Sequence, residues 1–155
     1  MEAIILLMSA IALIAFAFIY KSKTDRKKKR NRIKNKISEA SLEHNLEWSH
    51  VDIGLYRGIA WSAEKRKLFS VDMAREKETT QWIDMDNILA CNLVESGHSG
   101  IARKTIHTTS VELQFTPRDK GAVIAIPFYQ EEIDGIYEKI LLTQKAQHWK
   151  SILSK

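Results

Sequence analysis

The residues that could bind a metal or act as nucleophiles are few and widely spaced in this chain. One cysteine, Cys91, and two histidines, His98 and His107, lie in its middle, and none stands at a ligand spacing such as CxxC or HxxxH. Cys91 alternates with leucines in a predicted strand, so we interpret it as a small core residue. Ser99 beside His98 lacks a supporting third group for nucleophilic catalysis. We therefore predict no metal site, no cofactor and no enzymatic activity.

Three other patterns have structural interpretations. Asp84 and Asp86 could form a carboxylate pair, but they flank a predicted turn, where Asp side chains bond their own backbone. The four tryptophans are not interleaved with basic residues, so packing explains them better than stacking on single-stranded nucleic acid. The glycines of segment 97–100 lack the lysine and the strand-to-helix setting of a phosphate-binding loop.

The N-terminal segment has the composition of a membrane span. Ala3 to Tyr20 is eighteen residues without a charge, which as a helix would be about 27 Å long and close to the hydrocarbon thickness of a bilayer. A cleaved signal peptide is the alternative. However, Met1 and Glu2 do not make a positively charged start, and no small-residue cleavage site follows. We therefore predict an uncleaved transmembrane anchor over residues 1–20.

The basic charge is concentrated directly after this segment. Residues 1–36 hold ten basic and two acidic residues, a net charge of +8. Residues 37–155 hold fourteen basic and seventeen acidic residues, a net charge of −3. This split argues against nucleic-acid binding and, by the positive-inside rule, places the N-terminus outside and the rest in the cytoplasm, at the cell (inner) membrane. The predicted membrane-surface contacts are Lys21, Lys23, Arg26, Lys27, Lys28, Lys29, Arg30 and Arg32. A solvated topology signal without a partner is the alternative.

The remaining chain has room for one modest domain, so we predict a basic tract and stalk over residues 21–48 and a domain over residues 49–155. Short alternating runs predict strands at 53–61, 67–71, 79–83, 89–93, 101–107, 111–116 and 122–128. A long C-terminal helix is predicted from apolar residues at helical spacing, namely Ile133, Ile136, Tyr137, Ile140 and Leu141, continued by Ile152 and Leu153. The fold class is therefore α+β, mainly β.

Three stretches carry a resemblance to a known family: 58–61 turning into 67–71, then 82–90, then 111–115 through 124–128. They resemble small PH-like (pleckstrin-homology-like) domains of uncharacterised bacterial single-pass membrane proteins. The resemblance implies an antiparallel barrel of about seven strands capped by the C-terminal amphipathic helix, and binding rather than chemistry. It also implies headgroup or partner contact at the first hairpin turn, through Lys65, Arg66 and Lys67. These cations depart from the family's spaced basic pattern, and a solvated turn is the alternative.

Together these features predict a membrane-anchored interaction module. Its PH-like domain would be held at the cytoplasmic face of the membrane to bind a protein partner or a lipid headgroup, at an effective concentration raised by the tether. One alternative is a structural subunit of a membrane complex, assembled through its transmembrane helix by small residues on one helix face. The other is a membrane-associated hydrolase, which would need a pocket with converging polar groups.

Overall fold

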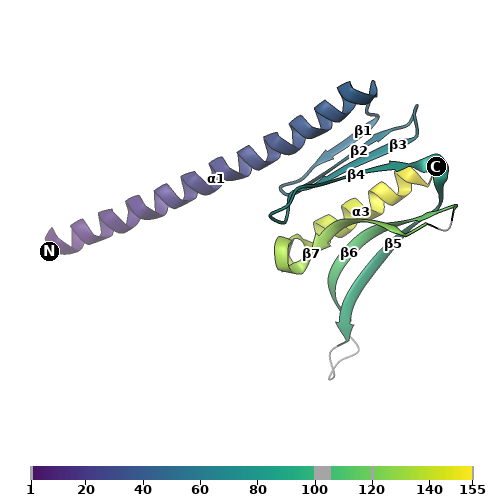
Figure 1. The fold of residues 1–155 in the computed structure, drawn as a ribbon. Helices are drawn as coiled ribbons and strands as arrows, with labels where there is room; N and C mark the ends of the chain where they lie inside the picture. The colour runs from purple at the N-terminus through teal and green to yellow at the C-terminus, as the bar shows by residue number, and fades with distance from the viewer. Residues whose placement is uncertain (1, 100–105, 120, 155) are drawn as a thin grey trace. The chain divides into compact units, whose positions relative to one another are not determined.

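The computed structural model describes residues 2–99, 106–119 and 121–154, without the side chains of residues 2–15, 17–19, 98, 99 and 106. By its internal contacts the chain divides into two compact units. The first comprises Met1–Lys65 and Phe69–Gln81, and the second comprises Arg66–Leu68 and Trp82–Lys155. Figure 1 shows the helices and strands of both units.

Four strands form the first sheet, in the order β1-β2-β3-β4. Their bounds are His50–Ile53 for β1, Arg57–Ser62 for β2, Lys67–Asp72 for β3 and Thr79–Asp84 for β4. Strands β1 and β2 pair in antiparallel fashion, and between them the Gly54 N–H donates to the Arg57 carbonyl at 2.8 Å. The prediction of one strand over 53–61 was therefore wrong, because this turn divides it into two.

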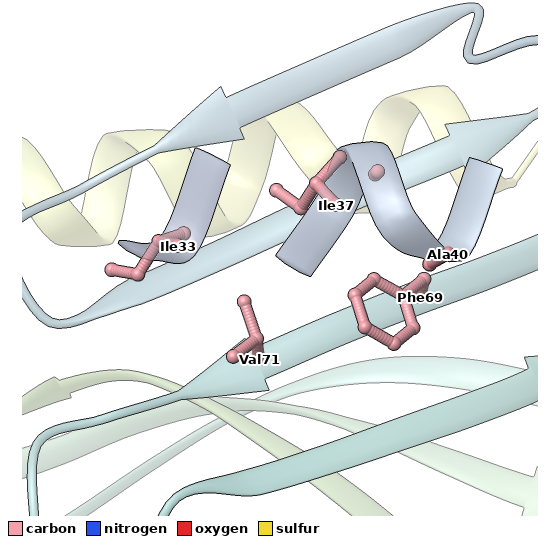
Figure 2. Close-up of a cluster of buried hydrophobic side chains, with 6 residues drawn as sticks. Ile33, Ile37, Ala40, Phe69 and Val71 are labelled. Carbon is pink, nitrogen blue, oxygen red and sulfur yellow. The ribbon is translucent and has the colours of Figure 1, made fainter. Parts of the chain in front are cut away.

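A long helix, α1 (Glu2–His44), packs on this sheet through its second half. Its buried residues Ile33, Ile37 and Ala40 follow helical spacing and form a core cluster with Ala60, Phe69 and Val71 (Figure 2). The sheet can accept the helix closely because Gly58 and Ala60 present almost no side chain on this face. The segment predicted as a stalk thus contributes to the core of the first unit.

The first half of α1 contains the predicted anchor, and the helix runs through it without a break. Within the part of the chain that the structure describes, no helix is long and apolar enough to cross a membrane. The transmembrane helix predicted over Ala3 to Tyr20 is therefore not found there and remains an expectation from the sequence.

Three strands form the second sheet, in the order β5-β6-β7 and antiparallel: Ile88–Ser99, Ile106–Pro117 and Ile124–Gln130. Alternate side chains of β6, Val111, Leu113 and Phe115, are fully buried, as their spacing predicts. Of the strand predicted over 101–107, residues 101–105 lie outside the described residues, and the last two residues begin β6.

The seven strands do not close into the predicted barrel. A single 3-10 turn, η1 (Met85–Asn87), follows β4 and separates it from β5, so the strands form two sheets. Asp84 caps this turn by accepting a hydrogen bond from the Asp86 N–H at 3.1 Å, which confirms the predicted backbone role of its side chain. The α+β class, with two antiparallel sheets and a C-terminal helix, is confirmed.

The predicted C-terminal helix consists of three pieces: α2 (Glu131–Asp134), η2 (Ile136–Glu138) and α3 (Lys139–Leu153). Gly135 breaks it with a φ of 75°, a value that glycine adopts without strain. Helix α3 contacts all three strands of the second sheet and buries Ala146, Trp149 and Leu153. Leu153 is buried as predicted, but Ile136, Tyr137, Ile140 and Leu141 are exposed, so the predicted buried face was wrong at the start of the helix.

Candidate functional site

The eight cations predicted to contact a membrane surface all lie on α1, and all eight are exposed. Five of them are consecutive, from Arg26 to Arg30. Because successive residues of an α-helix are rotated by about 100°, this run covers every side of the helix. The tract is therefore a positively charged rod rather than a one-sided basic stripe, a form that suits general attraction to an anionic surface.

Two of these cations contact the domain itself. The Lys29 ammonium lies 4.8 Å from the centre of the Tyr56 ring, a cation–π geometry. The Arg32 guanidinium bonds the Glu78 carboxylate at 2.9 Å, and Lys36 approaches the other oxygen of Glu78 at 3.6 Å. Since Glu78 is 46 positions from Arg32 in the chain, only the fold could show this pairing.

A cleft of about 370 Å³ lies between α1 and the loop that joins β3 to β4. It is lined by Lys29, Arg32, Met73, Ala74, Arg75, Glu76 and Glu78. Three cations and two carboxylates leave it a net charge of only +1, and Arg32 already binds one of the carboxylates. The cleft therefore offers weak attraction for a small anion and not a strong phosphate site.

The three cations predicted at the first hairpin turn are each paired with a carboxylate. Lys65 lies 3.1 Å from Glu64, and Arg66 lies 2.6 Å from Asp86. Lys67 donates to Asp84, and this hydrogen bond is the main reason that the pKa of Asp84 falls below its ordinary value of 3.8. A headgroup phosphate at this turn would have to displace these partners, which weakens the case for recognition there.

Among the described side chains, the residues considered for catalysis do not gather into a nucleophilic site. The His107 ring bonds Glu131, whose two carboxylate oxygens lie 2.9 Å from its Nε2. The side chains of His98 and Ser99 lie outside the described set. Cys91 is half-buried, and burial raises the pKa of its thiol, which lowers its nucleophilicity at neutral pH.

The His107–Glu131 contact could not be predicted from the sequence, because the two residues are 24 positions apart and are brought together by the β6–β7 pairing. In the described ranges, no group of three His, Cys, Asp or Glu residues could hold a metal ion. No protein-family model, no curated protein and no solved structure matches this chain. The resemblance to PH-like domains therefore remains an expectation.

Proposed function

We propose that this chain is a membrane-anchored, non-enzymatic interaction module that presents a PH-like domain at the cytoplasmic face of a membrane. The uncharged stretch from Ala3 to Tyr20, followed by the basic tract, supports the anchor and its orientation. In this proposal the tract contacts lipid headgroups, and the domain binds a protein partner.

The observation that carries the proposal is the continuity of α1 from Glu2 to His44. If the span ends at Tyr20, Ile33 lies thirteen residues further, or about 20 Å along the helix axis. The headgroup layer is only about 5–8 Å thick on each side of the hydrocarbon. The cations nearest the span, such as Lys21 and Lys23, would then lie among the headgroups. Ile33 would hold the first sheet about 12–15 Å beyond the headgroup layer.

The arrangement of the domain supports the PH-like part of the proposal. A four-stranded antiparallel sheet, a three-stranded antiparallel sheet and a C-terminal helix follow one another along the chain, in the order expected for a PH-like domain. The described residues contain no nucleophile paired with His107, which favours binding over hydrolysis.

Membrane extraction of the full chain tests the anchor. Expressed in a bacterial host with a C-terminal tag, the chain should stay in the membrane pellet after carbonate washing. An Ala12→Arg/Ala15→Arg variant should be released, because each charge at the centre of a span disfavours insertion by about 2.5–3.5 kcal/mol. As a matched control, Lys27→Gln/Lys28→Gln should remain in the pellet, since the helix keeps most of its downstream charge.

Protease treatment of spheroplasts tests the orientation. We expect the C-terminal tag to be cleaved only after lysis. Release of the unaltered chain by carbonate would refute the anchor, and cleavage of the tag in intact spheroplasts would refute the orientation.

A further inference from the structure

Four large apolar side chains form an exposed row at the start of the C-terminal helix. Ile136 is 60% exposed, Tyr137 99%, Ile140 72% and Leu141 51%. We call these four residues the C-terminal apolar stripe. Together they expose on the order of 500 Å² of mostly apolar surface, which is as large as the largest patch of a typical monomer. Patches of this size commonly mark an interaction site.

The stripe is distinct from the face by which α3 packs. At about 100° of rotation per residue, Ile140 and Leu141 point roughly opposite to Ala146, Trp149 and Leu153, the residues that α3 buries. The start of α3 therefore carries apolar side chains on a second face, which the second sheet does not cover. The core of the second unit does not account for the stripe.

The charge around the stripe is acidic. Residues 131–141 contain four acidic residues and one basic residue. Glu131 bonds His107, and Asp134 accepts from the Gln130 N–H at 2.8 Å. Glu132 and Glu138 are exposed and form no ion pair with any described residue. Among the described residues, these two carboxylates thus lie without an ion pair beside the apolar row.

We propose that the C-terminal apolar stripe is the docking surface for a basic amphipathic helix of a partner protein. Apolar side chains of such a helix would cover the stripe, and its Lys or Arg residues would face Glu132 and Glu138. An anionic bilayer would be repelled by these carboxylates. The basic tract of a second copy fits poorly, because residues 21–32 contain no apolar side chain. The inference rests on the proposed function for the existence of a protein partner.

Photocrosslinking at the stripe tests the proposal with a defined probe. The full chain, carrying a photoreactive phenylalanine at position 137, is placed in nanodiscs of zwitterionic lipid. The probe is a biotinylated 18-residue amphipathic helix of leucine and lysine; a peptide with glutamate at every lysine position is the reference. We expect the lysine peptide to crosslink at least about tenfold more than the glutamate peptide, and charge reversal by Glu132→Lys/Glu138→Lys to invert this preference.

The apolar contact is tested separately. Ile140→Ser/Leu141→Ser should lower crosslinking of the lysine peptide about tenfold or more, with the melting temperature unchanged because both side chains are exposed. The control, Asn92→Ser, alters an exposed residue of β5 outside the stripe and should not change crosslinking. Any of four outcomes would overturn the proposal. The two peptides could crosslink equally, or the crosslinks could form mainly with lipid or with a second copy. The Ile140→Ser/Leu141→Ser variant could crosslink like the unaltered chain, or it could lose melting temperature markedly.

This test and the extraction test fail independently. A chain that carbonate releases from the membrane but that still selects the lysine peptide would refute the anchor and keep the docking surface. A chain that resists carbonate and selects neither peptide would keep the anchor and refute the docking surface.

Discussion

Gly58 lies in β2 directly beneath α1, and its replacement by alanine tests how closely the helix packs on the sheet. A Cβ at this position would overlap Cγ2 of Ile33 and lie 3.0 Å from Cδ1 of Ile37 and 3.2 Å from Cγ1 of Val71. Real Cβ atoms essentially never show such an overlap, so the helix or Ile33 must move. Ile33→Ala removes the overlapped atom, which makes the two substitutions a natural pair.

The expected energies follow from burial and overlap. Gly58→Ala should destabilise by about 1–2 kcal/mol, since overpacking costs about 1–3 kcal/mol and the loss of glycine flexibility returns roughly 0.5–1 kcal/mol. Ile33 is 0% exposed, so Ile33→Ala should cost about 3 kcal/mol. In the double variant the new methyl group fills part of the vacated space. Its total cost should be about 3 kcal/mol rather than the roughly 4.5 kcal/mol of the sum.

Urea unfolding of the full chain in a mild detergent, followed by tryptophan fluorescence, measures these differences. Trp48 is a suitable reporter, because its indole N–H donates to the Ile37 carbonyl and its ring stacks on Phe69. Lys34→Ala, on the exposed side of the same helix, is the control and should change stability by less than about 0.5 kcal/mol. If the energies of Gly58→Ala and Ile33→Ala simply add, the described contact between α1 and β2 is wrong.

Three further outcomes are expected from the same unfolding assay. Tyr129→Phe should be neutral or stabilising by up to about 1 kcal/mol, because the buried Tyr129 hydroxyl has no hydrogen-bond partner in the described ranges; a loss above about 1 kcal/mol would reveal one. Gly97→Ala should destabilise by more than about 1 kcal/mol, since its Cβ would meet the backbone carbonyl of His107; an unchanged midpoint would contradict that approach. Lys67 lowers the pKa of Asp84, so their ion pair stabilises the fold above the ordinary pKa of the carboxyl and loses this effect as the pH falls through the lowered value. Lys67→Met should therefore reduce the acid dependence of stability, by less than about 1 kcal/mol. An unchanged pH profile would show that the pair contributes nothing.

The fold class and the β6–β7 region could be predicted because strict alternation of apolar residues has one main structural meaning. The division of segment 53–61 was missed, since its residues alternate straight through the turn at Gly54. The buried face of the last helix was also missed. The sequence pattern indicated a buried face that contains Tyr137 and Ile140. In the structure, α3 instead packs on the sheet through the face that contains Ala146 and Trp149, where the small Ala146 permits close approach.

The candidate sites were predicted less well than the fold. Sequence spacing located the cations of the first hairpin turn, but it could not show that Arg66 and Lys67 are paired with Asp86 and Asp84. The contacts of α1 with Glu78 were also invisible, because they join segments far apart in the chain. A usable signal was present at Gly58 and Ala60: two small residues on one strand face indicate that another backbone approaches there.

The unbroken course of α1 has a consequence for how a tethered domain samples its surroundings. A flexible linker lets a domain wander through a volume set by the linker's length, which dilutes it relative to any one partner. If α1 is anchored as proposed, its packing in the core of the first unit leaves that unit mainly rotation about the helix axis and tilt in the bilayer. The surface of the first unit would then stay at a nearly constant height above the lipid. A partner fixed at that height would meet it through lateral diffusion alone.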